Sequence, residues 1–540
     1  MAAFQVADWL DDAIMGARLL GGLRAHLRTP LTLPESRAIL RQRLENRGTD
    51  FLALTKQAIF ANRRSPYRAL LRLAGCEYGD LEHLVHLDGV EGALRVLLRR
   101  GVYLTVDEFK GKRPVVRGTT TVDAGPLLLQ NPLATPHFWG MTGGSRGAAT
   151  RLPLDLACVR DRAVNLYLSL DAQGGAAWRK AVWGTPTITA LLWYSICGGR
   201  AAAWFSQVDP GLRGLHPRYR WSVRAISWAS RLAGVPLPRL QHVPLDAPLP
   251  IARWMRAILA MGDIPHLWAF PSSAVTLCRA AEEAGIDITG ARFTITGEPV
   301  TTTRLSAIRR AGVVAVPDYG SADSGGSVTY GCLSPEAPDD VHLFQDLNAL
   351  IQADAAPFPS GALLISSLRP TVPFMLLNVS MGDCATVTDR RCGCPMETLG
   401  WRTHLHTIRS FEKLTAGGMT FVDTDVIRVL EQVLPDRFGG SPVDYQLIEG
   451  EAEDGRPQLS LLIHPRVGPL DARAVEEAFL GAIGTGSGAA RIMAHQWREG
   501  RMLRVEREPP RTGVLGKILH VWAPRATTAN GATGRADRDA

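Results

Sequence analysis

The sequence predicts an α/β fold, with a large multilayer α/β domain between a helical N-terminal segment and a small, mobile α+β C-terminal domain. Three observations predict it. Apolar residues recur at helical spacing through about the first 100 residues, short β-branched runs then alternate with amphipathic helices, and a shorter α+β pattern follows residue 409. A chain of 540 residues is also too long for a single core.

The domain boundaries follow from these changes of pattern. We expect the helical segment over residues 1–100, the large domain over 101–408, the small lid domain over 409–522 and a disordered tail over 523–540. The tail is assigned because it consists mostly of Ala, Thr, Gly, Arg and Asp and has no apolar periodicity.

The expected elements are read from periodicity. In the helical segment the apolar groups are Leu19, Leu20, Leu23 and Leu27, then Leu81, Leu84 and Val85, then Leu94, Leu97 and Leu98. In the large domain, strands are expected at 114–116, 293–296, 313–316 and 362–365, and helices at 274–284 and 303–311. In the small domain, strands are expected at 444–448 and 458–463, and helices at 422–433 and 472–483.

Composition excludes several classes of protein. Hydrophobic residues make up 46% of the chain and charged residues 21%, which is ordinary for a globular protein and excludes wholesale disorder. The net charge is +8, but the 60 basic residues form no long run, so we expect no nucleic-acid partner.

Cysteine use and hydropathy indicate a cytoplasmic protein without a membrane span. Eight cysteines in so long a chain do not make a disulfide scaffold, and acidic residues occupy the N-terminus where a signal peptide needs basic ones. The longest uncharged apolar stretch, 184–199, is shorter than the ~20 residues of a spanning helix and contains proline and glycine. We interpret it as buried core.

A glycine-rich stretch follows the aromatic run at 137–139. Residues 141–150 read Met-Thr-Gly-Gly-Ser-Arg-Gly-Ala-Ala-Thr. Glycine backbone N–H groups and hydroxyls suit phosphate oxygens, although such a loop taken alone is more often a simple turn.

Further motifs follow in a fixed order. They are a Gly-Glu-Pro turn within 294–300, a Tyr-Gly-Ser turn followed by an acid within 318–325, the pair Gly382 and Asp383, then Arg409, and Pro-Arg-Thr-Gly-Val-Leu-Gly-Lys at 510–517. In order and approximate spacing they resemble the core motifs of the adenylate-forming superfamily of acyl-CoA synthetases and adenylation domains. The helix at 65–71 and the cysteine pattern resemble the phenylacetate-CoA ligase-like branch. The resemblance covers roughly residues 60–522.

The resemblance implies the adenylate-forming enzyme fold and an AMP-forming acid–thiol ligase. A carboxylate attacks the α-phosphate of ATP to give an acyl-adenylate and pyrophosphate, and a thiol, with coenzyme A expected, then displaces AMP. It also implies Mg²⁺ as a cofactor.

Site residues are carried over position by position. The phosphate loop is matched by Thr142, Gly143, Gly144, Ser145 and Gly147. The nucleotide pocket is matched by Gly297, Glu298, Pro299, Tyr319, Gly320 and Ser321, and the ribose contacts by Asp383 and Arg409. Asp323 matches the acidic Mg²⁺ ligand, since a carboxylate oxygen suits that ion.

Lys517 is the expected catalytic residue. It is one of only six lysines and lies in the most specific of the motifs. A compact ammonium can bridge a carboxylate and the α-phosphate as charge develops on the oxygen that is transferred.

Several positions depart from the family pattern. Arg146 stands where a small hydroxyl residue is usual, Ala149 replaces proline, Asp323 replaces glutamate, Ser380 replaces the arginine before Gly-Asp, and Phe411 replaces an acidic hinge residue. The departure at Phe411 concerns the hinge for transfer to the thiol rather than adenylation. An amide-forming or carrier-loading ligase and a catalytically degenerate nucleotide-binding homologue remain alternatives.

A second group of residues indicates a metal. Cys332, His342, Cys392 and Cys394 supply three thiolates and one imidazole, a tetrahedral structural zinc set, and the resemblance supports it. Alternation in a strand makes His404 and His406 a possible metal pair, but we expect two surface histidines.

The acid itself is suggested only by aromatic residues. Trp193, Tyr194, Trp268 and Phe270 stand where the family lines its acyl pocket, and an aromatic cleft would suit an aryl or medium-length acyl group. The same residues are also compatible with core positions.

Overall fold

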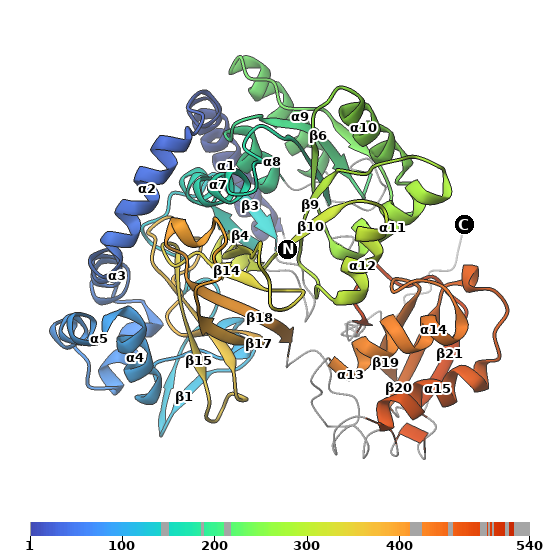
Figure 1. Ribbon diagram of the computed structural model, residues 1–540. Helices are drawn as coiled ribbons and strands as arrows, with labels where there is room; N and C mark the ends of the chain where they lie inside the picture. The colour runs from blue at the N-terminus through green and yellow to red at the C-terminus, as the bar shows by residue number, and fades with distance from the viewer. Residues whose placement is uncertain are drawn as a thin grey trace, which may run out of the picture.

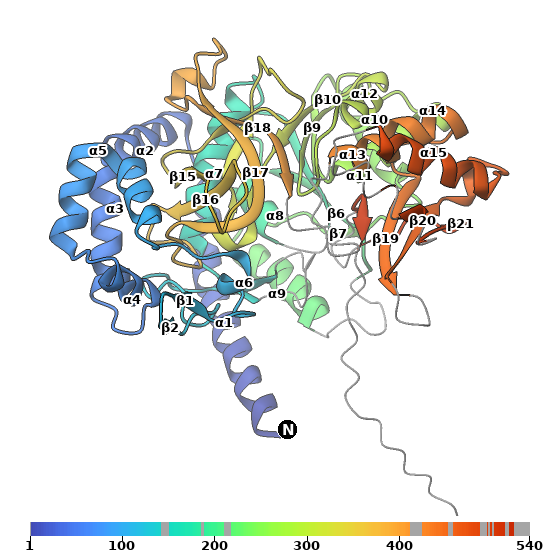
Figure 2. The same cartoon turned by 90° about the horizontal axis from the view of Figure 1, so that it is seen from below.

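The computed structural model describes residues 2–141, 151–184, 188–209, 218–410, 424–451, 457–485, 494, 497–498, 502–512 and 518–522. Three sheets of four or more strands organise these residues (Figure 1). The N-terminal helices pack on an antiparallel sheet, a parallel sheet follows, and the small domain lies beside the helices of that parallel sheet (Figures 1 and 2). The predicted α/β fold class is confirmed.

Helices fill the N-terminal segment. They are α1 (Ala2–Arg28), α2 (Leu33–Glu45), α3 (Arg47–Thr55), the π-helical η1 (Lys56–Phe60), α4 (Pro66–Leu73) and α5 (Tyr78–Arg99). Leu19, Leu23 and Leu27 are buried in α1, whereas Leu20 is 46% exposed. These helices share one core with the antiparallel sheet.

The antiparallel sheet has six strands. In spatial order they are β13 (Thr329–Gly331), β14 (Val341–Leu343), β18 (Thr403–Ser410), β17 (Val379–Asp389), β16 (Ala362–Ser367) and β15 (Asn348–Ala353). Small elements precede it in the chain: α6 (Val106–Phe109) and the paired strands β1 (Val115–Arg117) and β2 (Thr120–Val122). Since β18 pairs with both β14 and β17, chain segments about 60 residues apart become neighbours.

The parallel sheet also has six strands. In spatial order they are β10 (Val314–Asp318), β9 (Arg292–Thr296), β8 (Pro265–Ala269), β5 (Arg179–Gly184), β6 (Ala201–Ser206) and β7 (Leu240–His242). Its helices are α7 (Leu156–Asp171), α8 (Thr189–Ser195), α9 (Arg218–Leu232), α10 (Leu249–Ala260), α11 (Pro271–Glu283) and α12 (Thr302–Arg310). All neighbouring strands are parallel, so their carboxyl ends meet at one edge.

The expected buried stretch over 184–199 is confirmed for 190–197, whereas Thr189 and Gly198 are half-buried and Gly199 is exposed. Leu191, Leu192 and Trp193 of α8 lie in the interior. Among the described residues no helix combines the length and the apolar character needed to cross a bilayer.

The small domain has its own core. Its sheet has the order β21 (Leu503–Glu506), β20 (Pro457–Ile463), β19 (Tyr445–Glu451) and β22 (Val521–Trp522), and its helices are α13 (Thr424–Arg428), η5 (Val429–Val433), α14 (Leu434–Phe438) and α15 (Ala472–Gly484). The helix expected over 422–433 is α-helical only to Arg428, and η5 is a π-helix. Pro435 has no N–H to donate to the carbonyl of Glu431, which favours the wider turn before it.

Candidate active site and metal centre

Two of the predicted turns begin at the same edge of the parallel sheet. Strands β9 and β10 pair with Thr296 opposite Asp318, so the turn at Gly297 and the turn at Tyr319 start side by side. Gly297 has a φ of 81°, a conformation that favours glycine. Open α/β sheets bind ligands beyond the carboxyl ends of their strands, so this edge is the candidate site.

Tyr319 and Asp383 are brought together across this edge. The Tyr319 hydroxyl donates to Asp383 Oδ2 at 3.0 Å, linking the end of β10 to β17. Burial and the neighbouring Asp383 carboxylate raise the pKa of Tyr319 well above its usual value, so the phenol stays protonated and remains a donor. The contact fixes the orientation of the Asp383 carboxylate, which is predicted to accept hydrogen bonds from the ribose hydroxyls.

The Tyr-Gly-Ser turn forms a tight hairpin between β11 (Gly320–Ser321) and β12 (Gly326–Ser327). A Cβ at position 320 would lie 2.4 Å from the carbonyl oxygen of Gly326, so only glycine fits there. Ser321 Oγ accepts from the backbone N–H of Asp323 at 3.2 Å. Ser321 therefore orients the turn that carries Asp323.

Asp323 does not stand open to a metal ion. Its two carboxylate oxygens lie 2.9 and 2.8 Å from Nζ of Lys110, which follows α6. Sequence reasoning missed Lys110, because 213 residues separate it from Asp323 and no motif contains it. The only signal in the sequence was that lysine is rare in this chain, with six among 540 residues. In this structure the Lys110 ammonium lies against both oxygens that a cation at Asp323 would use.

We expect Lys110→Met to strengthen binding of a divalent cation at Asp323 by about tenfold, because a competing unit charge is removed at hydrogen-bond distance. Titration of Mn²⁺ followed by calorimetry measures this without substrate. The exposed Lys112 provides the control, and Lys112→Met should leave the affinity unchanged. Equal affinities in wild type and Lys110→Met would contradict the competition.

Two predicted nucleotide contacts have other partners in the structure. The Glu298 carboxylate accepts from Ser272, Arg304 and the backbone N–H of Ile518. Arg409 Nη1 lies 2.9 Å from Asp339 Oδ2. Strand pairing sets Ser410, not Arg409, opposite Asp383. A role for either side chain at the nucleotide stays a prediction.

Other predicted residues lie outside the described part of the chain. They are the phosphate-loop residues Thr142, Gly143, Gly144, Ser145 and Gly147, the departures Arg146, Ala149 and Phe411, and the catalytic candidate Lys517. On either side of the phosphate loop, β3 (Phe138–Met141) pairs antiparallel with β4 (Arg151–Leu154), with Met141 opposite Arg151. Ser380 is described and buried, and its Oγ accepts from the N–H of Gly382 at 3.2 Å.

Asp318, the last residue of β10, is a buried acid next to the site. Burial raises the pKa of Asp318 to about 7. The Ser327 hydroxyl, which donates to Oδ2 at 2.6 Å, opposes this shift by favouring the ionised carboxylate. A raised folded-state pKa means that the unfolded chain loses this proton at lower pH than the native protein does. Stability therefore falls as pH rises from about 4 and the loss is complete above about 7.

We expect Asp318→Asn to remove this pH dependence. The difference in Tm between the variant and wild type should increase in favour of the variant from pH 5 to pH 8, because only the wild type must then ionise a buried carboxyl. Thermal unfolding at several pH values measures the difference. Parallel Tm curves for the two proteins would show that Asp318 ionises as freely in the native state as in the unfolded chain.

Among the predicted acyl-pocket residues, Trp193, Tyr194 and Phe270 are buried and Trp268 is half-buried. Trp193 lies against Gly326, where a Cβ would be 2.7 Å from the indole, and the rings of Trp268 and Phe270 are 5.9 Å apart and face Gly184. Tyr194 is buried with its ring 5.6 Å from that of His266 and belongs to the core.

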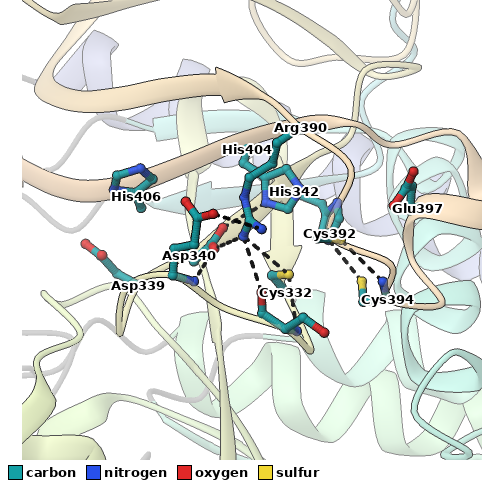
Figure 3. A network of polar contacts seen from close by, with 12 residues as sticks. Cys332, Asp339, Asp340, His342, Arg390, Cys392, Cys394, Glu397, His404 and His406 are labelled. Atoms are coloured by element: carbon teal, nitrogen blue, oxygen red, sulfur yellow. Dashed lines mark hydrogen bonds and ion pairs between the residues drawn. The ribbon is translucent and has the colours of Figure 1, made fainter.

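Five possible metal ligands lie close together on β14, on β18 and in the segments that follow β13 and β17 (Figure 3). Ligand atoms of Cys332, His342, Cys392 and His404 all lie within 4.8 Å of one another. Cys394 Sγ is 3.2 Å from Nε2 of His342. The predicted residues Cys332, His342, Cys392 and Cys394 are thus brought together, and the structure adds His404.

His404 corrects the sequence interpretation. The expectation of a surface histidine is wrong, because His404 is fully buried and pairs directly with His342 across the strands. Its Nδ1 hydrogen-bonds Asp340 at 2.9 Å, and its buried Nε2 has no hydrogen-bond partner among the residues that the structure describes. His406, half-buried, lies away from the cluster in Figure 3.

Both buried imidazoles are held as metal-binding histidines usually are. His342 Nδ1 donates to the carbonyl of Trp401 at 2.8 Å and His404 Nδ1 donates to a carboxylate, which leaves each Nε2 for a ligand. Backbone N–H groups of Ser334 and Cys394 point at the sulfurs of Cys332 and Cys392 at 3.3 and 3.4 Å. Such donors stabilise thiolates, so the donor set fits Zn²⁺.

No family model and no curated protein matches the sequence. Solved structures similar to this chain include 2-hydroxyisobutyryl-CoA ligase in complex with 2-HIB-AMP and CoA, at 16% identity over 94% of this chain and 90% of that chain, with a TM-score of 0.42. Another is the anthranilate CoA ligase AuaEII with anthranoyl-AMP, at 12% identity, 84% and 79% coverage and a TM-score of 0.44. A third is the amide bond synthetase McbA from Marinactinospora thermotolerans, at 12% identity, 93% and 98% coverage and a TM-score of 0.41.

Proposed function

We propose that this chain is an adenylate-forming ligase of the acyl-CoA synthetase type. It activates a carboxylic acid with ATP to an acyl-adenylate and passes the acyl group to a thiol, with coenzyme A as the expected acceptor. The observation that carries the proposal is the convergence of the turn at Gly297, the turn that carries Tyr319 and Asp323, and Asp383 at the carboxyl edge of the parallel sheet. Three separate motifs thus meet where such a sheet binds nucleotides.

The chemistry assigned to each group follows from its type. Asp383, oriented by Tyr319, accepts hydrogen bonds from the two ribose hydroxyls. The backbone N–H groups of the 142–147 loop hold the β- and γ-phosphates during in-line displacement. The Lys517 ammonium neutralises charge on the carboxylate and the α-phosphate as the bond to phosphorus forms and pyrophosphate leaves.

The implied metals fit this site differently. At Asp323, Lys110 already supplies a positive charge, so Mg²⁺ entering with ATP would have to displace the ammonium to bind this carboxylate. At the cysteine and histidine cluster the donors fit a structural Zn²⁺, whose contribution is to fix the loop of Cys392 against β14 and β18.

The substrate class is inferred from the aromatic residues near the site. Trp193 and Phe270 are buried and Trp268 is half-buried, and their apolar rings would suit an aryl or medium-length acyl group. A free carboxylate on the acid is required by the reaction. The proposal therefore names aryl and arylacetic acids first and medium-length fatty acids second.

Acid-dependent ATP–pyrophosphate exchange tests the proposal, because it reports adenylation without an acceptor. A panel of aryl, arylacetic, fatty and amino acids should give exchange with one class. Product analysis after adding coenzyme A, an amine or a carrier protein then identifies the acceptor. Folded, metal-replete protein that exchanges with no acid in the panel would favour the degenerate nucleotide-binding homologue.

A further inference from the structure

A chain of buried charged groups crosses from the large domain to the small one. Arg304 of α12 lies between two carboxylates, with Nη1 2.9 Å from Glu298 Oε2 and Nε 2.7 Å from Glu431 Oε1. His520 lies 2.5 Å from the same Glu431 oxygen. Glu298 and Arg304 belong to the large domain, and Glu431 and His520 to the small one. All four side chains are at most 3% exposed.

Glu298 is a junction of three chain segments. Its carboxylate accepts from the N–H and the hydroxyl of Ser272 at the start of α11, at 2.9 and 2.8 Å. A carboxylate at a helix N-terminus is favourable because it faces the positive end of the helix dipole. The same carboxylate accepts from the backbone N–H of Ile518 at 2.9 Å. Ile518 directly follows Lys517 in the sequence.

The two buried carboxylates, Glu298 and Glu431, share Arg304 across the domain boundary. The planar guanidinium of Arg304 can serve two carboxylates at once, which a lysine ammonium cannot do with the same geometry. Burial would raise the pKa of Glu431, but His520 and Arg304 outweigh it and the pKa is lowered, so Glu431 is ionised. Thr301 Oγ1 also donates to Glu431. Losing either partner would strand a buried charge.

Apolar packing supports the same arrangement of the domains. Val443 of the small domain is part of the buried core formed by the parallel sheet and its helices. A second polar contact lies nearby, where Arg279 of α11 donates to Ser441 at 3.1 Å and lies 3.6 Å from Asp444. Figure 1 shows the small domain beside α11 and α12.

We propose that Glu298, Arg304, Glu431 and His520 form an interdomain latch that fixes the small domain on α11 and α12 and holds the chain at Ile518, next to Lys517, for adenylation. Arg304, Glu431 and His520 are positioning residues, since none of the three is assigned a contact with substrate. The latch rests on the proposed function for its effect on catalysis. The docking it produces is a separate physical property that needs no activity to be measured.

Arg304→Gln tests the latch, with Arg279→Gln as the matched control at the same interface. We expect Arg304→Gln to lower kcat for pyrophosphate exchange by about 100-fold with KM for ATP within about twofold, as a small displacement of a catalytic group does. Arg279→Gln should change kcat by less than about twofold. His520→Gln keeps a hydrogen-bond donor for Glu431 but cannot carry a charge. We therefore expect this variant to lower kcat by about tenfold.

Amide hydrogen exchange followed by mass spectrometry is the readout that does not depend on activity. In the full-length protein, peptides that contain the Ile518 amide and those of η5 should lose protection together in Arg304→Gln and keep it in Arg279→Gln. If Arg304→Gln fails to fold, the same comparison is made with His520→Gln.

Two results would overturn the latch. One is Arg304→Gln protein with full protection at Ile518, which would show that docking does not need the network. The other is lost protection with unchanged kcat, which would reduce the network to a structural contact. If the wild-type protein shows no ATP–pyrophosphate exchange, the proposed function is wrong. Amide hydrogen exchange would still decide whether these residues hold the domains together.

Discussion

Lys517→Ala is expected to lower the rate of acid-dependent ATP–pyrophosphate exchange by about 10²–10³-fold, the loss typical of removing one donor aimed at charge that develops in the transition state. The reason is that a compact ammonium is required between the carboxylate and the α-phosphate only as the new bond forms. Binding of ATP should change little, since the phosphate loop and Asp383 are intact. Exchange kinetics and equilibrium binding of a fluorescent ATP analogue measure the two effects separately.

Lys56→Ala is the control for this prediction. Lys56 is exposed and lies outside every predicted motif, with its Nζ 4.8 Å from the centre of the Tyr78 ring. Its loss removes one lysine of six without touching the predicted site. Turnover that survives in Lys517→Ala at the wild-type level would remove the catalytic role assigned to Lys517. Equal losses in both variants would point to a general effect of charge.

The fold could be predicted because periodicity reports burial directly. The β-branched run at 293–296 lies within β9, and the apolar spacing at 274–284 matches α11 to within a few residues. The order of the strands in space could not be read, since β8 lies between β9 and β5 although α8, β6 and β7 separate β5 and β8 in the chain. Strand order depends on tertiary packing that local pattern does not contain.

The candidate site was predictable where a motif carries its own geometry. Only glycine fits the tight hairpin at position 320. Tyr319 follows the end of a strand, which brings its hydroxyl to Asp383 at the sheet edge. The partners of charged groups were not predictable. Lys110 reaches Asp323 across 213 residues, and Glu298 meets Ile518 across 220. Charged side chains act at contact distance, so their roles depend on neighbours that only the fold supplies.

The same limit explains the histidine that was missed. In a strand, alternate residues share a face, so His404 and His406 were assigned together to the surface. The structure shows that β14 covers one end of β18, where His342 pairs with His404, and that Thr407 has a φ of 55°, next to His406. The two histidines therefore have different surroundings although they are two residues apart.

His404→Ala is expected to remove bound zinc and to lower Tm by about 10 °C. Within the described part of the chain the buried Nε2 of His404 has no hydrogen-bond partner, and Asp340 holds Nδ1, so the side chain is already oriented as a ligand. Loss of a structural metal exceeds about 4 kcal/mol, and each kcal/mol is worth about 2–4 °C in a domain of a few hundred residues. Metal analysis of the purified protein and thermal unfolding measure the two effects.

His406→Ala and Cys394→Ser complete the experiment. His406 lies on the same strand and outside the cluster, so its loss should leave one zinc per chain and an unchanged Tm. Cys394→Ser distinguishes the two possible ligand sets, because a tetrahedral ion accepts only four of the five side chains present. Zinc lost in Cys394→Ser but kept in His404→Ala would establish three thiolates with His342. The opposite pattern would establish two thiolates with His342 and His404, each imidazole fixed by its own acceptor.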